Sequence, residues 1–444
     1  MGLTKSEFES IGDRILSQIE ADSAQLHLRQ TEDLQLRSAN NDITSNGVVD
    51  RFRIDIQVSY GKRSASIEIN QSDDASIRDA VGRVQQMAKL APEDPEHVPP
   101  VEPGEYLDPI TFSEATADLS PEDLLSRMRP VIEQSRAADV DGAGFLERSV
   151  TSAALINTNG LFLHERSTGV TFSLTARTSE GRGSGWASTQ ATDASKLDLA
   201  TAGERAIQKA LASRNAKRRE AGRTTVVLEA PGVRDLLSIL SWNLGKRNYD
   251  EGRSFLNGLV EEGDKIIGSE AFGKTATIFS DPLYPNAPCS VHSGGIPRQK
   301  TTWIDRGVVK NLIIPRYWAQ KLGIAPVPGP GNLIMPGEGE TTEELISKVE
   351  DGVLITRLWY LRQVQPQTLL YTGLTRDGTF AIRDGELAEP VNNFRFNESP
   401  TNVLRNIVSS GIAERVQGSE ASSPAHVPPL LVEDFNLSSI SDAS

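Results

Sequence analysis

Hydrophobic and polar residues alternate between residues 52 and 69, the pattern of strands with one buried face. The hydrophobic positions are Phe52, Ile54, Ile56, Val58, Tyr60, Ala65, Ile67 and Ile69. Gly61 and Lys62 interrupt the alternation, so the pattern predicts an antiparallel hairpin that turns at these two residues. Similar segments with glycine-rich turns between residues 149 and 188 predict an antiparallel meander.

Hydrophobic residues spaced three or four apart predict helices around these strands. The first stripe consists of Phe8, Ile11, Ile15 and Ile19, and the second of Ile77, Val81, Val84 and Ala88. Ser6 with Glu9 fits a capping box for the first helix, and Ser72 or Asp73 fits a cap for the second. A third helix is expected from Ser120, because Pro121 and two acidic residues follow it.

The segment 91–109, APEDPEHVPPVEPGEYLDP, is rich in proline and acidic residues and is expected to be an extended linker that does not pack. Beyond residue 258, short hydrophobic segments alternate with Gly and Asp-Gly turns, which indicates a mainly β structure. We therefore expect an α+β protein: an N-terminal α/β domain over 1–112 with an antiparallel sheet, a middle α/β segment over 113–222 that continues it, and a mainly antiparallel β domain over 223–444.

The composition narrows the range of partners. The chain has 444 residues, with 46 Lys and Arg against 60 Asp and Glu, and a net charge of −14 repels nucleic acid. The basic cluster of Arg214, Lys217, Arg218 and Arg219 is expected at the C-terminus of a helix, where cations complement the helix dipole. No apolar run reaches the roughly 18 residues of a membrane span. The single cysteine, Cys289, cannot form an intramolecular disulfide, so we expect a cytoplasmic protein.

Side chains that carry chemistry are sparse. The five histidines are His27, His97, His164, His292 and His426, and no two share a helical turn, so no HExxH or HExxxH zinc motif exists. Cys289, His292 and Ser293 are close in the segment CSVHSGG and suggest a nucleophile with its base. Five arginines lie in glycine-bearing segments of the second half and either converge on a peptide carboxylate or form separate salt bridges: Arg253, Arg298, Arg357, Arg362 and Arg376.

Several motifs in a specific order resemble the TldD/PmbA (TldD/TldE) family, whose members form a two-subunit intracellular metallopeptidase. The motifs are SANNDITSNGV, INTNGLFLHERSTGVTFSLTART, RTTVVLEAPGVRDLL, EGRSFLNG, GGIPRQKT, LWYLRQVQPQTLLYTGLTRDGTFAIRDGE and PVNNFRF. The resemblance covers nearly the whole chain. It implies the same division into an α/β N-terminal part and a mainly β C-terminal domain.

In the catalytic subunit of that family, the helix after a VVLEP-like strand carries HExxxH, which supplies two zinc ligands and a general base. The matching positions in this chain are Ser238, Ile239 and Asn243. The family's third ligand is a cysteine shortly before the last strand, and the corresponding segment QGSEASSPAHVPP has none. The chain therefore resembles the TldE/PmbA-type subunit, with no cofactor of its own and zinc in its partner.

The resemblance implies a non-catalytic subunit that completes the active-site cavity of a TldD-like, HExxxH-bearing homologue, as a heterodimer or higher oligomer that hydrolyses unfolded or modified peptides. Candidate substrate or interface residues, taken from motif position, are Arg253, Arg298, Tyr360, Thr372, Arg376 and Asp377. Two alternatives remain open. One is an independent, metal-free amide hydrolase that works through Ser293 or Cys289, and the other is a peptide-binding homo-oligomer.

Overall fold

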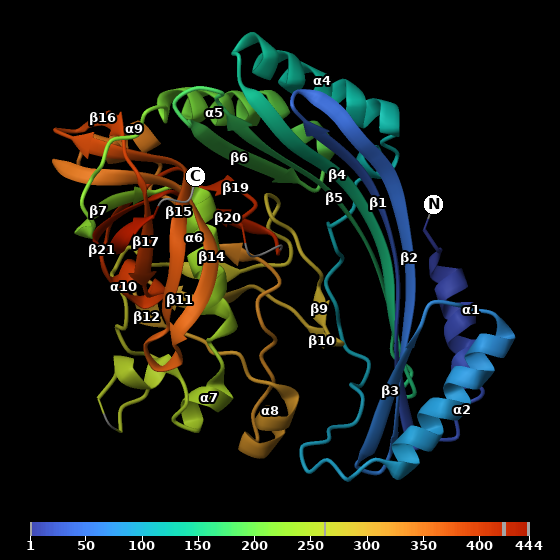
Figure 1. The fold of residues 1–444 in the computed structure, drawn as a ribbon. Helices are drawn as coiled ribbons and strands as arrows, with labels where there is room; N and C mark the ends of the chain where they lie inside the picture. Colours follow the sequence, from blue (N-terminus) through green and yellow to red (C-terminus); the bar gives the residue numbers. More distant parts are fainter. Residues whose placement is uncertain (1, 262, 420–422, 442–444) are drawn as a thin grey trace.

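A curved six-stranded antiparallel sheet forms one half of the molecule (Figure 1). The computed structural model describes residues 2–261, 263–419 and 423–441. The strand order is β3-β2-β1-β4-β5-β6. These strands are β1 (Ser23–Ala39), β2 (Asp42–Tyr60), β3 (Arg63–Ile69), β4 (Asp141–Asn157), β5 (Phe162–Arg177) and β6 (Ser184–Ala191). The predicted hairpin and meander are confirmed, because β2 pairs with β3 and β4, β5 and β6 pair in succession.

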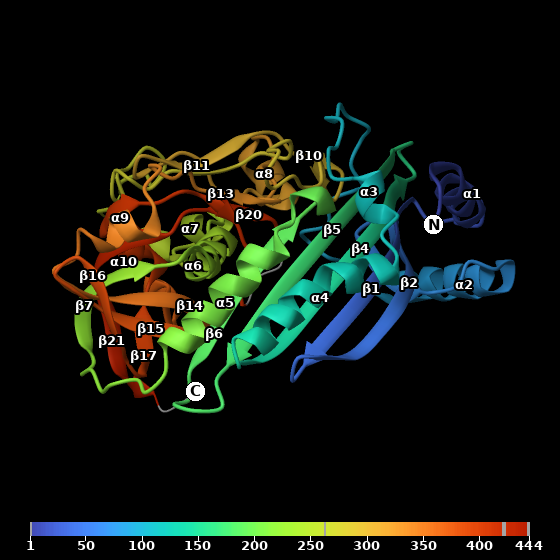
Figure 2. The same cartoon turned by 90° about the horizontal axis from the view of Figure 1, so that it is seen from above.

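Helices cover the convex face of this sheet at both ends (Figures 1 and 2). They are α1 (Lys5–Leu16), α2 (Asp74–Leu90), α4 (Pro121–Ala137) and α5 (Leu199–Ala212), with the short α3 (Glu114–Ala117) beside them. The hydrophobic stripes of α1 and α2 pack on β1 and β2 in one core, and those of α4 and α5 pack on β4 to β6 in another. Ser120 caps α4 in a reciprocal box with Asp123, as predicted.

Two local predictions were wrong by a few residues. The capping box of α1 is formed by Thr4 and Glu7, because the helix begins at Lys5 and its N-cap is therefore Thr4, two residues before Ser6. The basic cluster follows α5 instead of ending it, since α5 stops at Ala212. Arg219, its last member, pairs with Asp351 at 2.7 Å.

The second half is built on two sheets. A ring of hydrogen-bonded strands runs β14-β7-β21-β17-β15 and closes through a β14–β15 pairing, with β16 and β18 at its margin. The bounds are β7 (Gly222–Leu228), β14 (Asp351–Gln365), β15 (Leu370–Arg383), β16 (Glu386–Pro390), β17 (Asn393–Glu398), β18 (Ile407–Ser410) and β21 (Leu430–Ser441). The other sheet has the order β12-β11-β8-β13-β20-β19. Its bounds are β8 (Ile278–Ser280), β11 (Thr301–Asp305), β12 (Val308–Val309), β13 (Leu333–Ile334), β19 (Glu414–Arg415) and β20 (Ala425–Val427).

Helix α6 (Ala230–Trp242) lies between these sheets, against β14 on one side and β13 and β20 on the other. Every residue from Ala230 to Ser241 is buried. The shorter elements are α7 (Lys246–Asp250), β9 (His292–Ser293), β10 (Ile296–Pro297), α8 (Arg316–Leu322), α9 (Thr342–Ile346) and α10 (Pro400–Arg405). Of these, α10 packs against α6 and contributes Val403 and Leu404 to the core. The fold is thus α+β, as expected. None of the described helices combines the length and apolarity needed to cross a bilayer.

The proline-rich segment 91–109 is extended but it does pack, so that part of the prediction was wrong. It runs between the sheet and the second half (Figure 1). Asn157 donates from Nδ2 to the carbonyl of Val101 at 2.8 Å, and the hydroxyl of Tyr106 donates to the carbonyl of Gly295 at 2.6 Å. Proline removes backbone donors, and side-chain donors, one from β4 and one from the segment itself, supply these hydrogen bonds instead.

Glu165 on β5 fastens the two halves together. Its carboxylate accepts hydrogen bonds from Ser290 Oγ at 2.5 Å and from the backbone N–H of Val291 at 2.9 Å. Both donors belong to the loop that leads into β9. A carboxylate that accepts two such bonds in a half-buried position holds this loop more firmly than neutral pairs do.

We expect Glu165→Ala to loosen this loop. Loss of two charge-assisted hydrogen bonds raises amide hydrogen exchange in residues 289–297 about tenfold. Hydrogen exchange followed by mass spectrometry measures the effect. The control is Glu68→Ala, which removes an exposed carboxylate that faces Arg53 at 3.3 Å on β2. Unchanged exchange in the Glu165 variant would contradict this role.

Candidate functional site

Helix α6 does not present a metal site at the positions that the family uses. Ser238 Oγ donates to the carbonyl of Arg234 at 2.9 Å, and Asn243 Nδ2 donates to the carbonyl of Ile239 at 2.8 Å. Both polar side chains are thus tied to the backbone of their own helix, and Ile239 is a buried hydrocarbon. A serine hydroxyl, an amide and an alkyl chain do not fit zinc, which prefers imidazole, thiolate and carboxylate. Within the described ranges, no group of three or more His, Cys, Asp or Glu is placed to hold a metal ion.

The second turn of α6 instead carries two fully buried charges, Arg234 and Asp235. Asp235 accepts a hydrogen bond from the backbone N–H of Ser419 at 2.8 Å, and Arg234 donates to the carbonyl of Ser423. Burial lowers the pKa of Arg234, and the adjacent carboxylate opposes that shift. These two charges attach the segment before β20 to the helix.

A second buried ion pair connects the ring of strands to the N-terminal sheet. Arg357 on β14 donates from Nε to Asp377 on β15 at 2.7 Å, and Ser184 on β6 donates to the other oxygen of Asp377 at 2.6 Å. The guanidinium of Arg357 lies 4.6 Å from the ring centre of Trp186 and 5.2 Å from that of Trp359. Burial lowers the pKa of Arg357, and the charge of Asp377 opposes this. The pair therefore has to stay intact, since either charge alone would be buried without compensation.

The expected site residues are distributed over three places. On β14 and β15, Arg376 lies opposite Arg357 and above Trp359, and Thr372 lies opposite Arg362, so the structure brings Arg376, Thr372 and Asp377 onto one strand. Tyr360 is half exposed on β14 at φ 57°, beside the guanidinium of Arg362.

The two other expected arginines lie elsewhere. Arg253 follows α7 with an exposed side chain paired to Glu251. Arg298 follows β10, and its guanidinium donates to the carbonyls of Ser290, His292 and Gly329. Its donors thus hold the same loop that Glu165 holds from the other half.

Cys289, His292 and Ser293 do not form a catalytic arrangement in the described part of the chain. The thiol of Cys289 is buried and faces the carbonyl of Ser290 at 3.6 Å, and burial raises its pKa to about 11. His292 accepts at Nδ1 from the N–H of Gly295 at 3.3 Å, and its Nε2 lies 3.7 Å from Glu165. Among the residues that the structure describes, no hydrogen bond joins its ring to Cys289 or Ser293. A thiol that stays protonated, with no base beside it, is a poor nucleophile.

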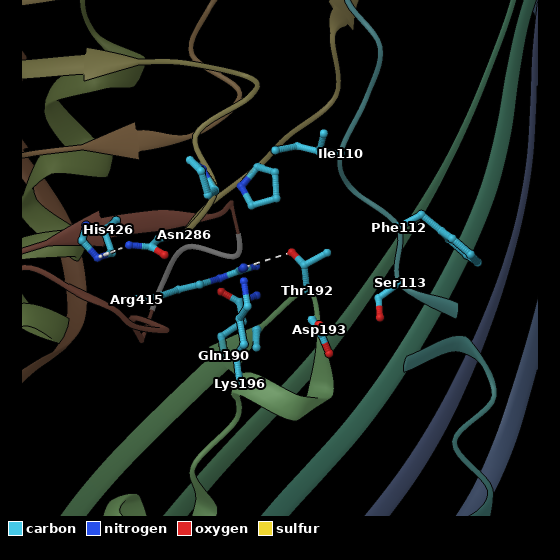
Figure 3. Close-up of a pocket in the computed structure, with 13 residues that line it drawn as sticks. Ile110, Phe112, Ser113, Gln190, Thr192, Asp193, Lys196, Asn286, Arg415 and His426 are labelled. Carbon is cyan, nitrogen blue, oxygen red and sulfur yellow. Dashed lines mark hydrogen bonds between the residues drawn. The ribbon is translucent and has the colours of Figure 1, made fainter. Parts of the chain in front are cut away.

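A cavity of about 520 Å³ opens between the two halves (Figure 3). Its walls come from the end of the linker, the end of β6, the loop before Cys289, and β19 with β20. The lining residues include Ile110, Ser113, Gln190, Thr192, Asp193, Lys196, Pro285, Asn286, Pro288, Arg415 and His426. Arg415 and His426 are direct cross-strand neighbours on β19 and β20.

The charge of Arg415 is poorly compensated. Its Nη1 donates to Thr192 Oγ1 at 3.0 Å, while Nε is buried with no hydrogen-bond partner. Burial lowers its pKa to about 10. Gln190 Oε1 in the same wall is also buried without a partner. Each such atom costs about 1–3 kcal/mol of stability, so this wall is maintained at an energetic cost.

Sequence reasoning did not identify Trp186, Asp235 or Arg415. The first two left a signal, since Trp186 ends the glycine-rich stretch GRGSGW at residues 181–186 and Asp235 is an ionisable residue in an apolar helix. Arg415 left none, because ERVQGSE has the composition of a surface turn.

Comparisons with known proteins identify the family. The sequence is that of a metallopeptidase-type protein: a model of the PmbA/TldA metallopeptidase C-terminal domain matches residues 221–439, and a model of the central domain matches residues 114–214. The chain belongs to the PmbA/TldD metallopeptidase family. The resemblance that the sequence motifs indicated is therefore confirmed.

Individual relatives are distant. A protein from Methanothermobacter thermautotrophicus described as a metalloprotease is 26% identical over 316 residues, which cover 63% of this chain and 65% of that protein, less than two thirds of its length. The structure of TldE from Thermococcus kodakarensis has a TM-score of 0.85 and 17% identity, and covers 97% of this chain and 99% of its own. A protein from Thermotoga maritima described as a candidate modulator of DNA gyrase has a TM-score of 0.84 and 19% identity, with the same coverage. At these identities the likeness to the two structures shows the fold.

Asp377→Asn tests the buried ion pair, because the variant keeps the size and tolerates φ 55° but leaves Arg357 buried without a counter-charge. We expect a loss of about 3 kcal/mol in the free energy of unfolding, measured by urea denaturation. The control is Asp351→Asn on the same pair of strands, whose carboxylate is 66% exposed and pairs with Arg219. That variant should lose less than about 1 kcal/mol. Equal losses in the two variants would contradict the assignment.

Cys289 should react slowly with iodoacetamide. Because the thiolate is the reactive form, a pKa raised from 9.0 to about 11 lowers the thiolate fraction about a hundredfold at pH 8. The rate should increase with pH up to about 11, whereas the thiol of the urea-unfolded chain should react with an ordinary pKa. Mass spectrometry of the alkylated peptide measures both rates. Rapid alkylation of the folded chain at pH 7 would reopen the case for a cysteine nucleophile.

Proposed function

We propose that this chain is a non-catalytic subunit of a TldD/TldE-like heteromeric zinc metallopeptidase in the cytoplasm. The observation that carries the proposal is helix α6, in which Ser238 and Asn243 bond to their own helix and Ile239 packs in the core. Zinc and the general base then belong to a HExxxH-bearing partner. The likeness in fold to TldE from Thermococcus kodakarensis supports this assignment.

This chain would contribute enclosure and orientation of the peptide. The expected contact surface is the end of β14 from residue 359 to residue 365, which we call the projecting part of β14. Tyr360 is 51% exposed there, and Val364 is 54% exposed. Exposed apolar side chains on a strand suit either an extended peptide or a partner surface. Trp186, Arg357, Trp359 and Arg376 stand in a continuous cation–π stack behind it. Such a stack restricts the rotamers of its side chains, which lowers the entropy cost of binding at this surface.

The first experiment compares the purified chain alone, a HExxxH-bearing homologue from the same genome alone, and their mixture. Metal analysis and cleavage of an unfolded peptide are measured on each sample. We expect zinc in the homologue and the mixture, and full activity only in the mixture. Full activity of the homologue alone would contradict the subunit role. Turnover by this chain alone would favour an independent hydrolase, and saturable peptide binding without any turnover or partner would favour a binding homo-oligomer.

Tyr360→Ala tests the contact surface within the same assay. Removal of a half-exposed aromatic anchor should lower the activity of the mixture about tenfold, without a change in the melting temperature of the chain. Leu387→Ala on β16 is the matched control, since Leu387 is 46% exposed in the same domain and lies across β15 from Gly352, at the other end of β14 from Tyr360. If both variants behave alike, the projecting part of β14 is not the contact surface.

A further inference from the structure

We infer that the cavity around Arg415 binds the C-terminal carboxylate of a short peptide. This inference rests on the proposed function, because it names the end of the peptide that this subunit holds. The site lies where β19 and β20 meet the end of β6. Its lining does not include the α6 positions Ser238, Ile239 and Asn243.

Charge is the first argument. Arg415 and Lys196 both line the cavity, and Figure 3 shows the Arg415 side chain reaching across it to Thr192. Asp193 is the single acid among the described lining residues, and its carboxylate accepts from the backbone N–H of Ser195 as the cap of the short helix 194–196. Glu414, beside Arg415, pairs with Arg205 on α5 at 3.2 Å. An acidic chain of net charge −14 thus holds a cation here without a carboxylate partner in its described part.

The hydrogen-bonding pattern is the second argument. A guanidinium offers five N–H donors. The hydrogen bond from Arg415 to Thr192 uses one of these donors, and its acceptor is a neutral hydroxyl. Its planar fork matches a carboxylate, which accepts two parallel bonds. His426 is held between Tyr284 and Asn286 at 3.3 Å each. Burial lowers the pKa of His426, and the charge of Arg415 lowers it further, which disfavours a second positive charge beside Arg415.

The remaining walls decide what bears the carboxylate. Ile110, Pro285 and Pro288 line the cavity on the side of the linker and the loop before Cys289. Apolar walls beside the two cations suit the last side chain of a peptide better than a free phosphate, which is hydrated on all sides. The volume of about 520 Å³ lies in the usual range of ligand cavities.

Isothermal titration calorimetry on the full chain, at low salt and pH 7, tests the inference with three probes: the peptide N-acetyl-Ala-Ala-Phe, its C-terminal amide, and inorganic phosphate. We expect the free acid to bind at least about tenfold more tightly than the amide, since a charged bidentate pair contributes a factor of this size. Phosphate should bind more weakly than the acid and compete with it.

Arg415→Gln should abolish the preference for the free acid. Lys196→Gln changes an exposed residue of the cavity lining and leaves the fold intact. It should reduce the preference for the free acid without abolishing it. Arg83→Gln is the matched control, because this arginine is exposed on α2, pairs with Asp79 at 3.4 Å and lies outside the cavity, so the preference should be unchanged.

Equal affinity for acid and amide, or an unchanged preference in both Arg415→Gln and Lys196→Gln, overturns the inference. If phosphate binds more tightly than the free acid, a peptide is not the occupant of the cavity and the inference is overturned. Because these titrations use the chain without its partner, they can fail while the mixed-subunit peptidase assay succeeds. The two proposals are therefore tested separately.

Discussion

The enclosure of α6 between two sheets is the constraint on which the rest of the structure depends. A helix buried on every side cannot expose a polar group to water, so each one has to find a partner within the protein. Ser238 meets this demand through the backbone of its own helix, and Asp235 meets it through Ser419. The same enclosure would hold metal ligands in fixed positions away from water if imidazole and carboxylate side chains occupied these positions. With serine, isoleucine and asparagine, it produces a structural wall instead.

Polar contacts, rather than a shared hydrophobic core, join the two halves. The main hydrophobic clusters lie within one half or the other. Between them, Asp377 binds both Arg357 and Ser184, and Glu165 holds the loop before β9. Directional bonds of this kind fix orientation more than they add stability, since desolvation offsets much of their energy. They set the geometry of the cavity at Arg415, whose walls come from both halves.

Strand and helix predictions succeeded where a local pattern decides the structure. The alternation in 52–69 and the cap at Ser120 are examples, because a strand face or a helix terminus is determined by residues close in sequence. The linker was misjudged, since Val101 and Tyr106 gain their partners, Asn157 and Gly295, from segments far away in sequence. Of the expected site residues, Arg376, Thr372 and Asp377 share β15, whereas Arg253 and Arg298 lie in other loops; sequence position alone cannot distinguish these cases.

The sequence by itself determined the family and the absence of HExxxH, because both depend on residue identity in a fixed order. It also determined the α+β class, since hydrophobic periodicity reports which face of an element is buried. Tertiary structure alone decided the position and surroundings of the charges. Arg357 finds Asp377 across a strand pair, and Arg415 meets Thr192 across more than two hundred residues. Burial and pairing arise from packing between distant segments, and no local pattern encodes them.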